Sequence, residues 1–236
     1  MSAYRHRWHV SGGLTVAIAG GEVVCRPSGA LWLESAAALI VADLHLEKGS
    51  AYARRGQLLP PFDTADSLTR LGAEVEAVAP RTLILLGDSF HDGAGEGRLC
   101  AADALRIGAL ARGRTLIWVL GNHDAMGPRA LPGERLAGVV MAGLSLVHEP
   151  GFGAGSGEVA GHLHPCARVS GPGGSVRRRC FVTDGERLIL PAFGAYAGGL
   201  NIRDPAFARH LARRPLAAVL GAARVHAVGW RSLRGD

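Results

Sequence analysis

Three short aliphatic runs mark the first half of the chain. They cover residues 38–42, 83–86 and 116–120, and apart from one tryptophan they contain only alanine, valine, leucine and isoleucine. Continuous apolar runs of this length, without alternating polar positions, indicate strands that are buried on both faces of a sheet. We therefore expect these runs to form the centre of one sheet.

Helical periodicity separates the three runs. Asp63 is a candidate N-cap for a helix that ends at Pro80, whose apolar positions recur at helical spacing: Leu68, Leu71, Val75 and Val78. A second helix is predicted from Leu99 to Arg112. Strands that alternate with helices require crossover connections, which predict that the central strands are parallel.

The flanking segments predict further strands and a second sheet. Short strands joined by glycine turns are expected at 14–18, 23–25 and 30–33, as a hairpin region that leads into the first sheet. After Gly121 the alternation weakens, and further strands are predicted at 144–147, 158–161, 180–183, 188–190 and 223–228, with a helix over 205–221. Together these elements predict an α/β fold in which two mixed β-sheets face each other and are flanked by helices, an αββα sandwich.

Candidate metal ligands follow the strand ends. Five motifs contain them: Asp43-Leu44-His45, Gly87-Asp88, Gly121-Asn122-His123-Asp124, His148 and Gly161-His162-Leu163-His164. Ligands of open α/β sheets bind at the carboxyl edge of the strands, so the first three motifs should converge in one crevice. Two d-block cations need about seven imidazole and carboxylate donors, with one carboxylate as a bridge. The motifs supply that number and predict a dinuclear metal site.

In their order, the motifs resemble the pattern of the calcineurin-like metallophosphoesterases, D-x-H, G-D, G-N-H-D, H and G-H-x-H. The resemblance implies the αββα metallophosphoesterase sandwich. It also implies two sets of ligands, Asp43, His45 and His164 for a first metal and Asn122, His148 and His162 for a second. By the same comparison, Asp88 bridges the two metals and His123 faces the scissile phosphate. No position of the pattern is missing.

Flanking sequences narrow the resemblance to the DNA-ligase-associated metallophosphoesterases, the PdeM-like group. Similar stretches lie at 41–49, 86–91, 148–150, 161–165 and 190–199, so the resemblance covers most of residues 14 to 202. It implies a manganese-dependent DNA endonuclease that acts on single-stranded DNA in DNA repair. It further implies a homodimer and a functional association with a DNA ligase and a helicase. Composition and spacing by themselves do not indicate DNA as the substrate.

The residues also account for phosphodiester hydrolysis, with Asp88, Asn122 and His123 as the catalytic set. Two cations that share Asp88 would activate a water as the nucleophile and clamp the phosphoryl oxygens. Histidine gains and loses a proton near neutral pH, so His123 could protonate the leaving oxygen. Asp124 either orients the His123 ring or caps the next helix. His91 either contacts substrate or a metal-bound water, or is an ordinary loop histidine.

Length and composition agree with a soluble enzyme. The chain has 236 residues, of which 48% are hydrophobic, and we expect one domain over residues 1–236. No apolar stretch approaches about 18 residues and the N-terminus lacks a signal peptide core, so we expect a cytoplasmic protein that does not bind membranes. The four cysteines form no C-x-x-C pair, which argues against a disulfide framework. Cys166 either approaches the metal centre or is a small buried side chain. The oxygen and imidazole donors of the proposed ligands favour manganese as the metal.

The net charge of +6 and the pI of about 9.8 permit attraction to nucleic acid. However, the chain is rich in alanine, glycine and arginine throughout, and such a bias raises the pI without any binding site. Arg54 and Arg55 either contact a phosphate backbone or are solvated. The run Arg177-Arg178-Arg179 either contacts phosphate or protects an edge strand by its charge.

Two glycine-rich segments each have two possible roles. Residues 151–157 form either a mobile rim over the active site or an inert connector. Residues 191–199 either pack closely beneath the metal turns or lie at a subunit interface.

Three functions are consistent with these patterns. The first is the two-metal DNA endonuclease. The second is hydrolysis of a small phosphodiester or a nucleotide pyrophosphate by the same site. The third is a binding platform that keeps the fold without catalysis, against which the intact set of Asp88, Asn122 and His123 argues.

Overall fold

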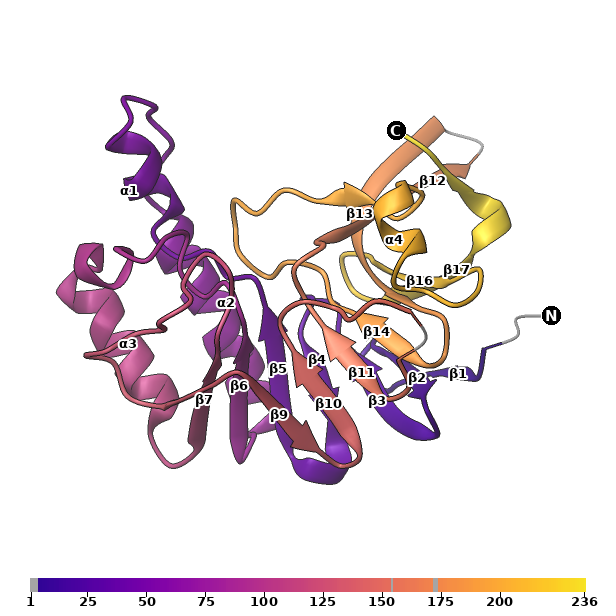
Figure 1. The fold of residues 1–236 in the computed structure, drawn as a ribbon, viewed down its shortest axis with the longest axis horizontal. Coiled ribbons are helices and arrows are strands. Elements are labelled where there is room, and N and C mark those ends of the chain that lie inside the picture. Colours follow the sequence, from indigo (N-terminus) through magenta and orange to yellow (C-terminus); the bar gives the residue numbers. More distant parts are fainter. Residues whose placement is uncertain (1–3, 154, 172–173) are drawn as a thin grey trace.

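Two β-sheets lie face to face in the computed structural model, which describes residues 4–153, 155–171 and 174–236 (Figure 1). The first sheet has eight strands in sequence order: β1 (His6–Trp8), β2 (Leu14–Ile18), β3 (Gly21–Cys25), β4 (Leu31–Leu33), β5 (Ala38–Ala42), β6 (Thr82–Leu86), β7 (Thr115–Val119) and β8 (Glu134–Leu136). Neighbouring strands are antiparallel from β1 to β5 and parallel from β5 to β8. The prediction of parallel central strands is therefore confirmed.

The second sheet contains ten strands: β9 (Gly138–Met141), β10 (Leu144–Val147), β11 (Glu158–Ala160), β12 (Pro165–Gly171), β13 (Gly174–Thr183), β14 (Arg187–Ile189), β15 (Leu200–Asn201), β16 (Leu216–Leu220), β17 (Val225–Gly229) and β18 (Leu233–Arg234). Its main path runs β15, β12, β13, β14, β11, β10, β9, while β16 joins β13 to β17 and β18 pairs with β12. β10, β11 and β14 are parallel, whereas β9 and β13 are antiparallel to their neighbours in this sheet. Both sheets are mixed, as predicted.

Helices flank the two sheets. They are α1 (Lys48–Ala53), α2 (Asp63–Val78), α3 (Ala101–Ala111) and α4 (Pro205–Ala208), with short 3-10 turns at Glu34–Ala36, Glu96–Arg98 and Trp230–Ser232. α2 and α3 pack on the first sheet and α4 packs on the second, which confirms the αββα sandwich. Among the described residues, no helix is long and apolar enough to cross a membrane.

The alternation of side chains along the central strands divides the core into two layers. Ile40 of β5 and Ile84 of β6 are aligned and pack in the cluster between the two sheets. The preceding residues, Leu39 and Leu83, are also aligned and pack on the opposite face with α2 and α3. Because both faces of these strands are covered, every position of the runs 38–42 and 83–86 carries an apolar side chain. This double coverage explains the continuous aliphatic runs.

The two predicted helices of the first half are present, but Asp63 does not cap α2. It is the first residue of the helix, and no side chain caps this end. Its carboxylate instead accepts a hydrogen bond of 3.1 Å from the Gly49 N–H. Asp63 therefore ties the start of α2 to α1, a contact between segments that a local capping rule does not foresee.

The predicted helix over 205–221 is wrong beyond its first residues. α4 ends at Ala208, and Leu216–Leu220 forms strand β16 between β13 and β17. The first four residues of β16 are buried. A short apolar run reads alike as a buried helix or a buried strand, and here pairing with two neighbouring strands decides the conformation.

Candidate metal centre

The central strands of the first sheet end side by side. Ala42 of β5 is paired with Leu86 of β6, and Leu86 with Val119 of β7, so the chain leaves all three strands at one edge. The loops after β5 and β6 remain paired beyond the strands, since the His45 N–H donates to the Asp88 carbonyl at 2.9 Å. The first two motifs are therefore in direct contact.

The second sheet brings the remaining histidines to the same edge. His148 follows β10, and His162 and His164 follow β11, its parallel neighbour. The Gly161 N–H donates to the His148 carbonyl at 3.0 Å, and the His162 N–H donates to the Asp43 carboxylate at 3.0 Å. Hydrogen bonds through Asp43 thus join the edges of the two sheets.

Asp43, His45 and His164 form one cluster. His45 Nε2 lies 3.2 Å from His164 Nε2, and His164 Nε2 lies 3.4 Å from Asp43 Oδ1. Donor atoms that surround one cation at about 2.1 Å are about 3.0–3.4 Å apart. The three side chains could therefore hold one divalent ion.

Asn122, His148 and His162 form a second cluster. Asn122 Oδ1 lies 3.0 Å from His148 Nε2 and 3.1 Å from His162 Nδ1, and the two ring nitrogens are 3.3 Å apart. These separations match those of the first cluster. An amide oxygen and two imidazole nitrogens could hold a second divalent ion.

Asp88 lies between the two clusters. Its Oδ1 is 3.4 Å from His148 Nε2, and its Oδ2 is 3.9 Å from His45 Nε2. One carboxylate oxygen therefore faces each cluster. This is the arrangement that a bridging carboxylate of a two-metal site requires.

Backbone strain is concentrated at these residues. Five of the seven candidate ligands have φ values between 45° and 68°, in the left-handed region: Asp43, His45, Asp88, His162 and His164. They make up half of the ten non-glycine residues with positive φ in the described part of the chain. Such a conformation costs about 1–3 kcal/mol per residue and persists only where the surrounding structure enforces it.

Two glycines make room for the candidate ligands. A Cβ atom at Gly87 would lie 2.1 Å from His148 Nδ1, and one at Gly121 would lie 2.2 Å from the backbone nitrogen of Asp88. Both positions therefore exclude a side chain. The glycines of the G-D and G-N-H-D motifs allow segments from different strands to approach at the site.

The charges of the site suit cation binding. Burial and the neighbouring His164 lower the pKa of His45 to about 3, which keeps its ring neutral. Burial opposes ionisation of Asp88, but a hydrogen bond with His148 lowers the pKa of Asp88 to about 2. Burial disfavours the charged form of His148, but Asp88 and Asp43 raise its pKa. Neutral imidazole and ionised carboxylate are the forms that bind metal, and His45 and Asp88 hold them near neutral pH.

His123 lies beside Asp88 and is positioned by the backbone of His91. The His123 N–H donates to Asp88 Oδ1 at 2.9 Å, and its ring Nδ1 is 2.7 Å from the His91 carbonyl. Because a carbonyl only accepts, Nδ1 carries a proton, and Nε2 lies 3.9 Å from Asp88 Oδ2. The rings of His91 and His123 are 5.6 Å apart and cluster with His45. His91 therefore belongs to the site. Its backbone carbonyl orients the His123 ring, a role that a sequence motif of side chains does not reveal.

Asp124 has neither of the two roles predicted for it. Its buried carboxylate accepts the N–H groups of Phe90 at 3.1 Å and Gly121 at 3.2 Å. The His123 ring is held by His91 instead, and the residues that follow Asp124 form turns rather than a helix. Asp124 therefore fastens the loop after β7 to the loop after β6.

The segment 191–199 packs beneath the turn that carries Asp43, which was one of its two expected roles. The Phe193 N–H donates to the Ala42 carbonyl at 2.8 Å, and the Gly194 N–H donates to the Asp43 carbonyl at 3.1 Å. A Cβ atom at Gly194 would lie 1.9 Å from the Leu44 carbonyl oxygen, so the approach requires glycine.

Arg179 holds this segment in place. Its guanidinium donates three hydrogen bonds of 2.8–3.0 Å to the carbonyls of Ala192, Gly194 and Ala197. The neighbouring Arg178 is exposed, and residues 174–179 pair with β12 alone among the described strands. Exposure on this edge fits both roles predicted for Arg178, protection of the edge strand and contact with phosphate, whereas Arg179 has a distinct role. The sequence pattern of three successive arginines does not distinguish Arg179 from its neighbours.

Packing decides the roles of Cys166 and of the segment 151–157. Cys166 is buried in β12 with its Sγ against Gly199, where a Cβ atom would lie 2.2 Å away, so it is a small core side chain. Arg187 anchors the described part of the 151–157 segment, because it donates to the Gly153 carbonyl at 3.1 Å and pairs with Glu158 at 2.6 Å. These contacts support the connector role of that segment.

A similar fold occurs in the nuclease MPE from Pseudomonas putida. The two structures match with a TM-score of 0.67 at 25% sequence identity, over 95% of this chain and 100% of that chain. The phosphoesterase Yfce from E. coli gives a TM-score of 0.41 at 13% identity, over 81% of this chain and 98% of that chain. No family model and no curated protein matches the sequence. The likeness to the nuclease confirms the metallophosphoesterase sandwich that the motifs indicated.

Replacing Asp88 by alanine is expected to remove metal binding at both positions, because one carboxylate oxygen faces each cluster. Equilibrium dialysis against Mn²⁺ followed by elemental analysis measures the ions bound per chain. Asp66→Asn, an exposed carboxylate on α2, should bind as many ions as the wild type. Wild-type binding by Asp88→Ala would contradict the bridging position.

Replacing Arg179 by methionine is expected to weaken Mn²⁺ affinity by about 10- to 100-fold, the range for groups that orient metal ligands. The physical reason is that the released 192–197 segment no longer supports the Asp43 turn. Calorimetric titration measures the affinity, and thermal unfolding measures the loss of stability. The matched control is Arg178→Met at the adjacent exposed position, and equal affinities in the two variants would refute the role of Arg179.

Proposed function

We propose that this protein is a manganese-dependent endonuclease that cuts single-stranded DNA in DNA repair. The enzyme is a metal-dependent phosphodiester hydrolase, as its nuclease neighbour and its histidine and aspartate clusters indicate. The single observation that carries the proposal is the position of Asp88 between two clusters of metal donors. A cytoplasmic location, a homodimer and a functional association with a DNA ligase and a helicase complete the proposal.

The two clusters are assigned to two divalent ions. In this assignment Asp43, His45 and His164 would hold the first ion, Asn122, His148 and His162 would hold the second, and Asp88 would serve both. Manganese suits these ligands because they offer only oxygen and imidazole nitrogen atoms. The thiol of Cys166, which would favour a softer metal, is buried in β12.

The proposed mechanism uses His123 as the proton donor. When bound, the two ions supply an activated water and neutralise charge on the phosphoryl oxygens. The Nδ1–H of His123 is fixed on the His91 carbonyl, so the ring presents Nε2 to the substrate. When the His123 ring carries protons on both nitrogens, the Nε2 proton passes to the leaving oxygen as the bond between that oxygen and phosphorus breaks. Asp88 holds the His123 backbone and so places the ring beside the reacting phosphate.

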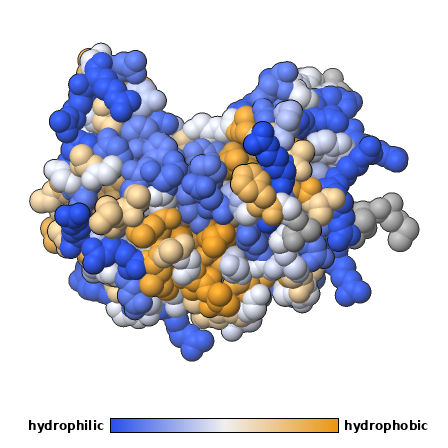
Figure 2. All heavy atoms as spheres, in the orientation of Figure 1, coloured by the Kyte–Doolittle hydropathy of each residue, from blue (hydrophilic) through white to orange (hydrophobic). Residues whose placement is uncertain are grey.

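An open, basic surface supports a polymeric substrate over a small one. α1 projects from the sandwich, and the exposed Arg54 and Arg55 lie at its end (Figure 1). Figure 2 shows the surface hollowed between the raised, hydrophilic region around α1 and a second raised region around β12 and β13. The exposed Arg177 and Arg178 lie on β13. Arginines on both raised regions would attract a phosphate backbone that crosses the hollow.

Hydrolysis of a small diester or a nucleotide pyrophosphate would use the same residues, and the open surface argues against it. The binding platform is disfavoured on a physical ground. Five strained residues lie in the two adjacent donor clusters, and each costs free energy of folding that a binding platform would not require.

The proposal is tested with metal-stripped protein, added Mn²⁺, a circular single-stranded DNA and a chromogenic phosphodiester, with Asp88→Ala as the blank. We expect wild type alone to cut both substrates, because each contains the phosphodiester that the metal centre would hydrolyse. Turnover of the small diester with intact DNA would move the substrate to a small molecule. Silence on both substrates would favour the binding platform.

His123→Ala is expected to keep both metals while its rate falls by about 100- to 10,000-fold, the range for a general acid. The reason is that the His123 ring lies outside the two proposed ligand sets. Metal analysis and single-turnover cleavage are measured on the same preparation. His226→Ala, an exposed histidine on β17, serves as the control. Loss of metal from His123→Ala would show that the assigned role is wrong.

A further inference from the structure

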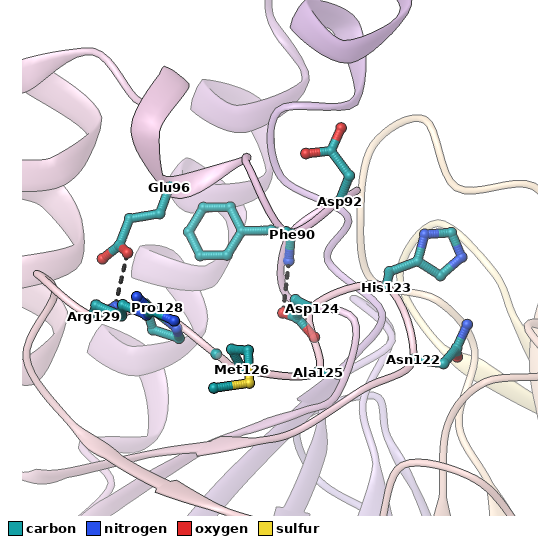
Figure 3. Close-up of a pocket in the computed structure, with 12 residues that line it drawn as sticks. Phe90, Asp92, Glu96, Asn122, His123, Asp124, Ala125, Met126, Pro128 and Arg129 are labelled. Carbon is teal, nitrogen blue, oxygen red and sulfur yellow. Dashed lines mark hydrogen bonds between the residues drawn. The ribbon is translucent and has the colours of Figure 1, made fainter.

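A cavity of about 530 Å³ opens beside His123. It lies between the loop after β6 and the loop after β7, with Asn122 and His123 at one end and Glu96 and Arg129 at the other (Figure 3). Its volume is typical of small-molecule sites, which span about 300–1,000 Å³. The cavity is therefore continuous with the metal centre but extends away from the metal donors.

The charges of the cavity disfavour phosphate. Three carboxylates line it, those of Asp92, Glu96 and Asp124, against two guanidinium groups, that of Arg129 in the lining and that of Arg98, which pairs with Asp92 at 2.8 Å. Each carboxylate already accepts hydrogen bonds from the protein. Glu96 accepts the N–H groups of Arg129, Ala130 and Leu131 at 2.7–3.0 Å, and Asp92 accepts from Ala94 and Arg98. Carboxylates engaged in this way form a fixed wall, which repels an anion and has few free acceptors for a cation.

The apolar part of the lining suits a flat, uncharged group. The buried ring of Phe90 forms part of the wall and stacks on Trp118 behind it, with ring centroids 6.1 Å apart. Met126 lies on the cavity with 68% of its surface exposed (Figure 3). A thioether packs well against aromatic rings because it is polarisable. The exposed methionine is therefore available to a planar ring that enters the cavity.

We propose that this cavity is a nucleobase subsite, which holds the base of the nucleoside on the leaving-oxygen side of the cut. The inference rests on the proposed function, because it takes His123 as the donor to the leaving oxygen. That oxygen must lie about 3 Å from the His123 ring, so the attached sugar and base begin at the end of the cavity that His123 lines. The sugar-phosphate backbone remains over the metal centre. Only the uncharged base enters the cavity that the carboxylates line.

The test uses single-stranded oligodeoxynucleotides in which one residue is replaced by an abasic tetrahydrofuran analogue. Cleavage sites and rates are mapped from both ends with Mn²⁺. The bond whose leaving side carries the abasic residue should be cut at least about fivefold more slowly, the scale of stacking one base. An abasic residue on the other side should leave the rate unchanged. Met126→Ala should abolish this difference between the two sides, whereas Val140→Ala, an exposed side chain on β9, should keep it.

Each other outcome overturns the proposal. If the wild type cuts at equal rates with the abasic residue on either side of the bond, the cavity is not a base subsite. If only an abasic residue on the side away from the leaving oxygen slows cleavage, the assignment of the subsite to the leaving group is refuted. If Met126→Ala, with unchanged thermal unfolding, keeps the wild-type ratio of cleavage rates between the two abasic positions, the role of this cavity is refuted. Absence of any DNA cleavage would overturn the proposed function itself, and the subsite with it.

Discussion

The position of Asp88 between two donor clusters is the constraint on which the site depends. One carboxylate oxygen faces His148 and the other faces His45, so a single side chain sets the spacing of the clusters. The side chain is itself fixed by the backbone, since it accepts the His123 N–H and its main chain lies against Gly121. The geometry of the site therefore derives from tight turns at strand ends rather than from flexible side chains.

These turns explain why the site needs a doubly covered sheet beneath it. Five left-handed residues at about 1–3 kcal/mol each would relax in a loosely packed loop. Here the turns continue from strands whose alternate residues, such as Leu83 and Ile84, are buried on opposite faces. From the other side, Arg179 holds the segment whose N–H groups bond to Ala42 and Asp43. Packing on all sides supplies the free energy that the strained turns require.

The metal donors, the exposed arginines and the carboxylates of the cavity lie on different parts of the molecule. Metal donors lie where the edges of the two sheets meet, while the exposed arginines lie on the projecting α1 region and on β13. The cavity beside His123 is instead lined by carboxylates that accept hydrogen bonds from the facing loop, as Asp124 does from Phe90 and Glu96 from Ala130. A charged backbone and an uncharged base would thus meet different surfaces. In the proposed mechanism, His123 lies between the metal centre and the leaving group.

The central strands, α2, α3 and the order of the candidate ligands could all be predicted from the sequence, because apolar runs, helical spacing and motif residues are local signals. The convergence of the motifs also followed from the sequence, since parallel strands end at one edge. Contacts between distant segments are what make Leu216–Leu220 a strand, bind Asp63 to the backbone of α1 and Asp124 to the loop after β6, and let Arg179 support the Asp43 turn. Each of these depends on hydrogen bonds between segments distant in the chain, which leave no periodic pattern in the sequence.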